Sequence, residues 1–463
     1  MARDSEGLNN NINAPLPKAA GLYFGQMNCQ PVQKGQHMEL ITKAPKGTAD
    51  KLPSEINKWH TVEEVAAKVA ETYGCREIRT PTFEHTELFQ RGVGGTTDVV
   101  QKEMYTFNDK KGRSITLKPE GTAGVVRAAI ENGLLNEALP QKLYYFTSCF
   151  RYEAPQSGRL REFRQFGVEI FGADSPICDA ETICMVNDIF KFLQLDNVSL
   201  EINSIGCPEC RARYHEALKA YYQQYKDQLC DTCKERLERN PMRLLDCKSE
   251  ICHGFAEKAP IILDYLCDAC ADHFETVRST LDKMNIKYTV NPRIVRGLDY
   301  YTNTVFEFVS DSCGAQGTVC GGGRYNGLVE EVGGKPLSGF GFAMGLERLL
   351  MVMDAQNCTY SPAKQCDLYI AGTDPSASAY ASTLVRQLRS YGFWAECDIV
   401  GRSLKAQMKY ADKINARFSM VVGENEIDSG SAELKNMKTG EKFAVSIGDN
   451  FAEKVNSILM DIE

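Results

Sequence analysis

Two apolar runs separated by an arginine-rich loop place the strongest constraint on the fold of this chain. Leu143-Tyr144-Tyr145-Phe146 precedes the loop, and Phe166-Gly167-Val168-Glu169-Ile170-Phe171 follows it. Aromatic and β-branched runs on either side of a polar segment are typical of an antiparallel strand pair. The sequence therefore predicts a strand-rich block over about residues 114–172, with a charged loop at the end of one hairpin.

The loop itself is rich in groups that bind nucleotides. It holds Arg151, Arg159, Arg161 and Arg164, with Phe163 among them. Guanidinium groups hold phosphates in a bidentate manner, and a flat ring beside them can stack on a base. The alternative is a solvated hairpin tip with surface ion pairs, which is the better explanation for such a loop taken alone.

A second arginine follows a glycine-rich segment. Gly339-Phe340-Gly341-Phe342-Ala343-Met344-Gly345 leads to Arg348, and we predict a glycine turn that passes into an apolar helix ending near Met353. Arg348 could cover the other face of a base, although alone this segment is better explained as a buried helix start. The sequence contains no Walker A loop, no Gly-x-Ser-x-Gly turn and no His-Glu-x-x-His motif, so common ATPase, hydrolase and metalloprotease systems are not supported.

Changes of pattern along the chain predict its domain organisation. Apolar residues recur at helical spacing over 53–73 and 180–195, strands resume at 294–309 and 317–320, and the last block alternates strands with helices. Residues 1–37 are predicted to be a flexible tail, in which Gly35-Gln36-His37-Met38 resembles a cloning remnant before a start methionine. We expect these parts: tail 1–37, first strand-rich part 38–206, helical insertion 207–285, second strand-rich part 286–356, linker 357–365 and final α/β domain 366–463.

Eight of the 18 cysteines fall within the insertion. They are Cys207, Cys210, Cys230, Cys233, Cys247, Cys252, Cys267 and Cys270. The chain has no secretory signal in its first thirty residues and no apolar run long enough for a membrane span, so we expect a reducing cytoplasm and no membrane. Three Cys-x-x-Cys pairs and one looser pair then predict structural Zn²⁺, in two four-cysteine sites or one site with spares. The competing interpretation is a set of small buried residues in a helical insertion.

Five segments together resemble the histidyl-tRNA synthetase family of class II aminoacyl-tRNA synthetases. Thr80-Pro81-Thr82-Phe83-Glu84 resembles motif 1, the arginine loop motif 2, and the segment ending at Arg348 motif 3. The segments 296–307 (Arg-Gly-Leu-Asp-Tyr-Tyr-Thr-Asn-Thr-Val-Phe-Glu) and 320–329 (Cys-Gly-Gly-Gly-Arg-Tyr-Asn-Gly-Leu-Val) are similar to the two signature peptides of that family. The resemblance spans about Met38 to the C-terminus.

The resemblance implies a fold, a reaction and partners. The expected fold is an α+β catalytic domain with an antiparallel sheet, a helical insertion and a C-terminal α/β anticodon-binding domain. The implied reaction attaches L-histidine to tRNA(His) with ATP and Mg²⁺, through a histidyl-adenylate, in a cytoplasmic homodimer whose interface includes the motif 1 proline. A carboxylate nucleophile is already ionised at neutral pH, so positioning and positive charge suit this chemistry better than a protein base.

The resemblance also implies roles for individual residues. Arg151 and Arg296 are the implied catalytic residues. Arg151 would hold the α-phosphate and the histidine carboxylate, and Arg296 would approach the α-phosphate from the other side. The implied ATP site adds Glu153, Arg161, Phe163 and Arg348. The implied histidine site adds Glu120, Gly121, Thr122, Gln165, Glu169, Tyr300, Tyr301 and Tyr325, with Glu169 and Tyr301 on the imidazole nitrogens.

One basic stripe is the candidate tRNA contact of the final domain. Arg402, Lys405, Lys409, Lys413 and Arg417 recur at three- or four-residue spacing, so they share a helix face. The net charge of the chain is −8, so RNA binding depends on a local basic patch. A solvated helix face explains a lone stripe equally well, and the synthetase motifs favour tRNA contact.

Two other functions share some of these sequence features. The regulatory paralogue of ATP phosphoribosyltransferase shares the core, but it usually lacks the last domain and has eroded motifs, whereas Arg151, Arg296 and Arg348 are all present here. A zinc-ribbon nucleic-acid-binding protein would explain the cysteines alone and leave most of the chain unexplained. Histidine-dependent pyrophosphate exchange separates all three.

Overall fold

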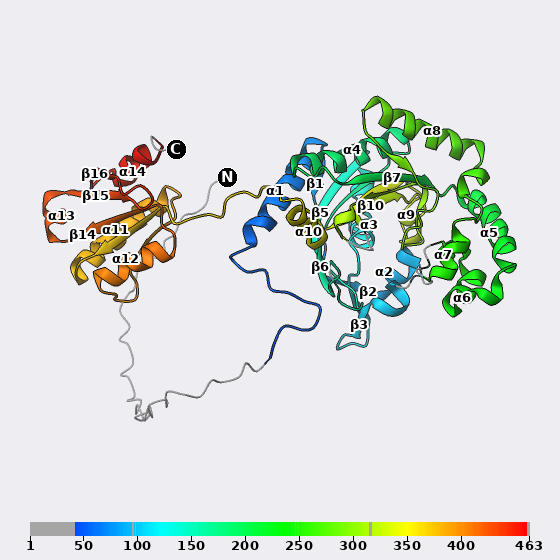
Figure 1. The fold of residues 1–463 in the computed structure, drawn as a ribbon, viewed down its shortest axis with the longest axis horizontal. Coiled ribbons are helices and arrows are strands. Elements are labelled where there is room, and N and C mark those ends of the chain that lie inside the picture. Colours follow the sequence, from blue (N-terminus) through cyan, green and yellow to red (C-terminus); the bar gives the residue numbers. More distant parts are fainter. Residues whose placement is uncertain are drawn as a thin grey trace, which may run out of the picture. The chain divides into compact units, whose positions relative to one another are not determined.

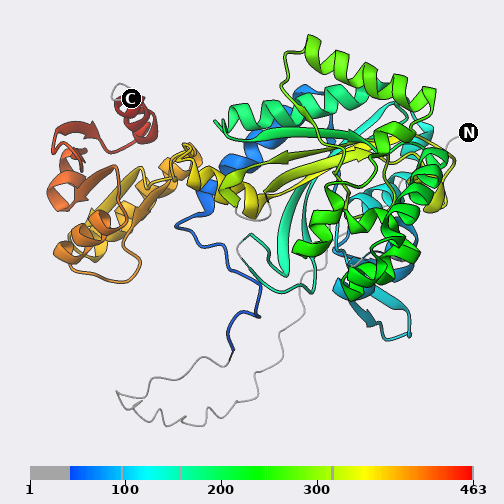
Figure 2. The same cartoon turned by 45° about the vertical axis from the view of Figure 1, so that its right-hand side comes forward.

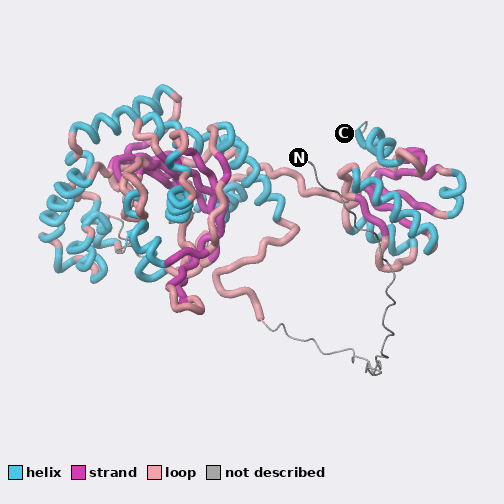
Figure 3. The backbone as a smooth tube through the Cα atoms, turned by 180° about the vertical axis from the view of Figure 1, so that it is seen from behind, coloured by secondary structure: helices cyan, strands magenta, loops and turns pink. Residues whose placement is uncertain are grey.

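The computed structural model describes residues 42–94, 97, 99–156, 158–245, 247, 249–313 and 317–460. The predicted tail, 1–37, lies outside these residues. The described chain forms an eight-stranded sheet, a five-stranded sheet and a small three-stranded sheet. Each of the two larger sheets is flanked by helices (Figures 1 and 3).

The eight-stranded sheet has the order β1-β5-β6-β11-β10-β9-β7-β8. Its strands are β1 (Arg76–Glu77), β5 (Gln141–Phe150), β6 (Glu162–Phe171), β7 (Ser199–Ser204), β8 (Thr289–Val290), β9 (Thr302–Val309), β10 (Thr318–Arg324) and β11 (Gly339–Gly345). The six central strands are antiparallel, and β5 and β6 pair over their full length from Gln141–Phe171 to Phe150–Glu162. The predicted strand pair is therefore confirmed.

The sheet differs from the expected antiparallel arrangement at its two edges. The short strands β1 and β8 pair in parallel with β5 and β7. A parallel pair needs a long crossover connection, and here the connections are the segment between β1 and β5 and the whole insertion between β7 and β8. The expected antiparallel arrangement is correct for the six central strands. The two parallel pairs at the edges make the sheet as a whole a mixed one.

The two faces of the sheet carry separate apolar cores, because neighbouring strand residues point to opposite faces. Tyr144, Phe166 and Val168 pack in one core with residues of α1 (Ile56–Thr72), α4 (Pro176–Phe192), α8 (Asp268–Lys283) and α10 (Leu346–Ala355). Leu143 and Tyr145 pack in the other core with residues of α3 (Thr122–Glu131) and of the insertion. Helices α4 and α8 run beside each other along the sheet in both ribbon views (Figures 1 and 2).

The insertion is helical, as predicted. It contains α5 (Pro208–Gln223), α6 (Asp231–Arg239), α7 (Glu250–Ala256) and α8, with short helical turns at Lys226–Gln228, Pro241–Leu244 and Ile262–Tyr265. The apolar residues of α5, α6 and α7 are continuous with the core on the second sheet face, and those of α8 pack in the core on the first face. The insertion is therefore packed against the sheet rather than folded around a core of its own.

Two predicted elements are wrong. The segment Gly339–Gly345 is the central strand β11 rather than a glycine turn, and the predicted strand at 294–309 begins only at Thr302. In β11 the glycines alternate with Phe340, Phe342 and Met344, which are buried, so the period-two signal of a strand was present but was masked by glycine. Residues 294–301 instead run as an irregular segment past the site described below.

The small sheet has the order β2-β4-β3, with β2 (Phe83–His85), β3 (Tyr105–Asn108) and β4 (Ser114–Leu117). Short helical segments α2 (Thr86–Phe89), Gln90–Gly94 and Val99–Glu103 accompany it, α9 (Leu328–Glu331) follows β10, and Leu134–Asn136 and Asp311–Cys313 are further turns. The side chains of Phe83 and Phe107 on this sheet are 55% and 49% exposed. An apolar surface of this kind suits a partner rather than water.

The five-stranded sheet has the order β13-β12-β14-β15-β16. Its elements are β12 (Leu368–Gly372), α11 (Pro375–Ser390), β13 (Ala395–Cys397), α12 (Leu404–Lys413), β14 (Phe418–Val422), α13 (Glu424–Ser429), β15 (Ser431–Asn436), β16 (Lys442–Ser446) and α14 (Phe451–Met460). The alternation predicted up to residue 423 is confirmed, and the last hairpin and two helices were not predicted. These elements enclose their own apolar core.

Candidate active site and cysteine clusters

A cavity of about 300 Å³ lies at the centre of the large sheet, among β6, β11, β10 and the irregular segment before β9. It brings together residues that are up to about two hundred positions apart in the chain. Twelve of the predicted histidine and ATP residues line it: Glu120, Thr122, Arg151, Glu153, Phe163, Gln165, Glu169, Arg296, Tyr300, Tyr301, Tyr325 and Arg348.

A buried carboxylate forms one wall of the cavity. Thr122 Oγ1 donates a hydrogen bond to Glu169 Oε1 at 2.7 Å, Tyr145 Oη donates to the same oxygen at 3.0 Å, and Tyr325 donates to the other oxygen. Burial nevertheless raises the pKa of Glu169 to about 8, since three neutral hydroxyls do not replace the lost water. A ligand that offers an N–H or a positive charge to this carboxylate would relieve that cost.

A second buried carboxylate begins helix α3. Glu120 accepts hydrogen bonds from the backbone N–H groups of Thr122 and Ala123 at 2.8 and 2.9 Å. Burial raises the pKa of Glu120, against the opposing effect of these bonds. Beside it, Gln165 accepts a hydrogen bond from the Cys149 thiol at 3.2 Å. The cavity thus has two acidic groups at one end, which suit an ammonium group and a ring N–H.

Arg296 is a partly buried arginine on the irregular segment. It forms an ion pair with Glu307 of β9, and Thr318 Oγ1 fixes the second carboxylate oxygen at 2.7 Å. A Cβ on Gly321 would collide with the Arg296 guanidinium, so the glycine on β10 leaves room for this group in its present position. Although burial opposes it, the Glu307 charge raises the pKa of Arg296, so this positive charge is permanent.

The cavity is also lined by the nucleotide candidates. The Arg151 guanidinium lies 5.3 Å from the Phe163 ring centre and donates to the carbonyl of Pro119 at 2.8 Å. Arg348 donates to the carbonyl of Thr318 at 2.6 Å, and Glu153 accepts from Arg159 at 3.1 Å. A flat ring and two guanidinium planes thus share one opening, which suits a purine and its phosphates.

Two predicted site residues do not line the cavity. Arg161 stacks on the Tyr152 ring at 4.0 Å and donates to the carbonyl of Glu153. Gly121 lies behind the wall, where a Cβ would fall 2.3 Å from the Tyr145 ring. Glycine at this position leaves room for the Tyr145 ring, whose hydroxyl donates a hydrogen bond to Glu169.

Sequence analysis missed two residues of the site. Tyr145 reads as an ordinary core position in an apolar strand, and only the pairing of β5 with β6 brings its hydroxyl to Glu169. Glu307 lies within the segment that resembles a signature peptide, but no role was assigned to it. Its signal was a single acidic residue at an otherwise apolar strand position.

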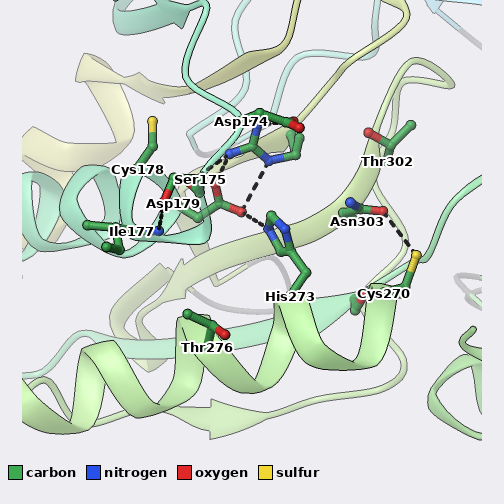
Figure 4. A network of polar contacts seen from close by, with 12 residues as sticks. Asp174, Ser175, Ile177, Cys178, Asp179, Cys270, His273, Thr276, Thr302 and Asn303 are labelled. Carbon is green, nitrogen blue, oxygen red and sulfur yellow. Dashed lines mark hydrogen bonds and ion pairs between the residues drawn. The ribbon is translucent and has the colours of Figure 1, made fainter. Parts of the chain in front are cut away.

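A buried ion network supports the end of β10. Arg324 is fully buried and pairs with both oxygens of Asp179 on α4, while His273 of α8 bonds the same carboxylate at 2.8 Å. Figure 4 shows Asp179 with His273 reaching it from α8. The network joins the sheet, α4 and the last helix of the insertion.

The eight cysteines of the insertion form two separate groups. We call Cys207, Cys210, Cys267 and Cys270 the first cluster, and Cys230, Cys233, Cys247 and Cys252 the second cluster. Within each group all four sulfurs lie within 4.8 Å of one another. The structure therefore provides two four-cysteine groups, as the first of the two expected arrangements requires.

The clusters fit a tetrahedral metal. Cys207, Cys230 and Cys267 each cap the start of a helix, which leaves the second cysteine of each pair one turn along. The sulfurs of Cys207 and Cys210 are 3.5 Å apart. A tetrahedron with metal–sulfur distances of about 2.3 Å has edges of about 3.8 Å, so only small shifts would complete it.

The predicted basic stripe divides in the structure. Lys405, Lys409 and Lys413 are exposed on α12. Arg402 precedes the helix and pairs with Asp398 at 2.8 Å, and Arg417 follows it and pairs with Asp367 at 3.2 Å. Three lysines therefore present one exposed face, and the two arginines are engaged within the fold.

No helix in the described part of the chain is long and apolar enough to cross a membrane. This agrees with the absence of a long apolar run in the sequence.

Comparison with known proteins gives matches to most of the chain. The family model described as histidyl-tRNA synthetase matches residues 47–349, and that of the anticodon binding domain matches residues 366–457. The chain is 57% identical over 408 residues to the histidine–tRNA ligase of Acetivibrio thermocellus, covering 88% of this chain and 98% of the relative. It is 55% identical over 420 residues to that of Clostridium novyi, covering 91% of this chain and the full length of the relative. The solved apo histidyl-tRNA synthetase of S. aureus superposes with a TM-score of 0.76 at 40% identity, covering 89% of this chain and 99% of that chain.

Proposed function

The chain belongs to the histidyl-tRNA synthetase family and is a histidine–tRNA ligase, and from this premise we propose which of its residues carry the reaction. A class II catalytic domain is joined to an anticodon-binding α/β domain. We propose that the insertion and linker divide these parts at the boundaries expected from the sequence, with the catalytic core in 38–206 and 286–356.

The proposed reaction has two steps. A carboxylate oxygen of histidine attacks the α-phosphorus of ATP, supplied as its Mg²⁺ complex, and the bond to the departing pyrophosphate breaks. A ribose hydroxyl at the end of tRNA(His) then bonds the histidyl carbonyl carbon, loses its proton, and AMP leaves. Both steps build up negative charge on oxygen, which fixed positive groups stabilise.

We assign the positive groups to Arg151 and Arg296. They enter the cavity from the β5–β6 loop and from the segment before β9, so an α-phosphate between them would meet charge on two sides. The Glu307 carboxylate orients the Arg296 guanidinium before substrate arrives. Phe163 and Arg348 would sandwich the adenine, and Glu153 and Arg161 would contact its edge and the outer phosphates.

The acidic end of the cavity would take the histidine. Glu120, Thr122 and Gln165 would bind the α-amino group, and Glu169 and Tyr301 the imidazole nitrogens, with Tyr300 and Tyr325 around the ring. The observation that carries the proposal is the Glu169 carboxylate, which is fully buried and faces only hydroxyl donors. A side chain without a ring N–H would leave that carboxylate poorly paired, and such sites reject ligands by large factors.

Pyrophosphate exchange tests the proposed site. Purified protein should exchange labelled pyrophosphate into ATP only when histidine is added, and Glu169→Ala should abolish histidine binding while ATP binding persists. Exchange that is independent of histidine, or unchanged in Glu169→Ala, would contradict the assignment.

We propose that each cysteine cluster holds one Zn²⁺ with a structural role. The support is two groups of four sulfurs, in each of which all sulfurs lie within 4.8 Å of one another. A metal would neutralise four crowded sulfurs and would join helices that share little core of their own. Elemental analysis of protein purified without chelator should find two zinc ions per chain, and less than one per two chains would contradict the proposal.

Two further proposals concern partners. A homodimer would cover the exposed small sheet around Phe83, next to the motif 1 proline Pro81. The lysine face of α12, together with Arg402, would contact tRNA phosphates in the cytoplasm, where tRNA is charged. Each is tested in the Discussion.

A further inference from the structure

The first cysteine cluster lies directly against the segment that carries the histidine-binding tyrosines. Cys207 follows strand β7, whose last residue Ser204 pairs with Thr304 at the start of β9. The backbone N–H of Ile205 donates to the carbonyl of Asn303 at 2.8 Å, and that of Asn303 donates to Gly206 at 3.0 Å. These bonds extend the sheet up to the cluster.

Side chains add two contacts to the same segment. The Cys270 thiol lies 3.6 Å from Asn303 Oδ1, as Figure 4 shows. Arg211, which follows Cys210, donates to the carbonyl of Tyr301 at 2.9 Å. An Asn amide offers both an acceptor and a donor, so a half-turn of Asn303 would let it donate to a Cys270 thiolate.

The conformation of Asn303 shows why the segment needs such support. Its φ is 47°, in the left-handed region, which costs energy for a residue with a side chain and which Asn tolerates better than most. Asn303 stands two positions after Tyr301, whose ring lies 5.6 Å from the Arg296 guanidinium. A shift of this turn would move both the tyrosine and the stacked arginine.

The far end of the segment is held by the neighbourhood of the second cluster. Arg243 donates to the carbonyl of Gly297 at 2.7 Å and lies 3.4 Å from Asp299. The insertion thus contacts residues 297, 299, 301 and 303. The contacts nearest to Tyr301 come from residues within or beside the first cluster. They are made by Gly206, Cys270 and Arg211.

We propose that the metal in the first cluster positions the histidine-binding segment 296–303, with Cys270, Asn303 and Arg211 as positioning residues. Metal occupancy of the insertion would then change the affinity for histidine more than the affinity for ATP, because the segment carries the tyrosines of the histidine site, whereas Phe163 and Arg348 of the ATP site lie outside it. This deepens the zinc proposal above and differs from the sequence-based expectation that zinc acts only on stability or on tRNA contact.

The test compares variants of the full chain by three measurements. These are zinc content, the KM values for histidine and ATP in pyrophosphate exchange, and amide hydrogen exchange over 296–303. Cys270→Ser should lose about one zinc per chain, raise the histidine KM about tenfold or more, and speed amide exchange in this segment. The ATP KM should rise less than the histidine KM, because the segment carries Arg296 but neither Phe163 nor Arg348. Cys358→Ser, a cysteine outside the insertion, is the matched control and should leave all three unchanged.

Asn303→Gly separates the contact from the metal and guards against a variant that fails to fold. Glycine accepts the left-handed backbone, so this variant should keep both zinc ions and still raise the histidine KM and the amide exchange. Loss of zinc in Cys270→Ser with no change in histidine KM and segment exchange would overturn the inference. So would equal rises in the two KM values. Zinc-free wild-type protein would overturn the zinc proposal itself, and Asn303→Gly with a wild-type histidine KM would overturn the proposed contact separately.

Discussion

Glu169 illustrates how one residue combines a binding role with a cost in stability. It is fully buried on β6 and its pKa is raised to about 8 by loss of water. The folded empty protein therefore holds a proton that the unfolded chain releases above its ordinary pKa of 4.5. The contribution of Glu169 to the free energy of unfolding is therefore fully present below pH 4.5 and is lost as the pH rises toward 8.

The first prediction concerns the pH dependence of stability that Glu169 causes. Between about pH 5 and pH 8 the free energy of unfolding of the ligand-free protein should fall by up to about 1.4 kcal/mol per pH unit because of Glu169. Glu169→Gln removes the titration with little change of volume, so its stability should fall less steeply over that range. Urea denaturation at several pH values measures both slopes. Parallel profiles for the two proteins would show that Glu169 is ionised throughout.

The second prediction concerns Arg296, whose guanidinium is proposed to act on transition-state charge. Arg296→Ala should lower the turnover of pyrophosphate exchange by about 100–1000-fold, the usual effect of losing one preorganised donor. Because Glu307 then loses its partner, unfolding should be followed by circular dichroism, with assays kept well below the transition. The exposed Arg386 on α11 provides the control Arg386→Ala. Near-wild-type exchange in Arg296→Ala would remove this residue from the mechanism.

At the scale of elements, helix α12 shows how a sequence pattern was only partly right. The periodic spacing placed five basic residues on one face, but the helix spans only Leu404–Lys413. Arg402 and Arg417 lie beyond its ends and pair with Asp398 and Asp367. The tRNA proposal now depends mainly on the three exposed lysines.

The third prediction tests that helix. Replacing Lys405, Lys409 and Lys413 by Glu should weaken tRNA charging markedly and reduce its salt dependence, because phosphate contacts are lost. Histidine-dependent pyrophosphate exchange should stay unchanged. A charge-matched control replaces the exposed lysines Lys435, Lys438 and Lys454 of the same domain by Glu. Equal loss of charging in both triple variants would mean that net charge alone is responsible.

At the scale of the whole molecule, the small sheet leaves large apolar side chains uncovered. Phe83 and Phe107 are about half exposed, and they lie on the two outer strands of the small sheet, β2 and β3, on either side of β4. A symmetry mate would cover them with the same surface on both subunits.

The fourth prediction is a dimer in solution at micromolar concentration, measured by light scattering. Phe83→Glu and Phe107→Glu together should shift the mass toward the monomer, since two buried charges would face each other across the axis. The exposed Tyr391, which follows α11, provides the control Tyr391→Glu, which should remain dimeric. A monomeric wild-type protein would contradict the proposal.

Local patterns in the sequence were enough to predict the strand pair of β5 and β6, the helical insertion and the alternation of the last domain. Each of these depends on the period of apolar residues within one segment. The resemblance to a family then predicted twelve residues that the structure brings to one cavity, because short motifs preserve the chemistry of a site even when they lie far apart in the chain.

Other features were decided only by the tertiary structure. The strand at Gly339–Gly345 was missed because its glycines look like a turn until β6 and β10 lie on either side. The hydroxyl of Tyr145 and the carboxylate of Glu307 became part of the site only through strand pairing. The division of the eight cysteines into two clusters joins Cys210 to Cys267 across most of the insertion. Spacing along the chain determines which residues share a turn of a helix. Contacts between distant segments depend on how helices and strands pack, and no single segment of the sequence determines that packing.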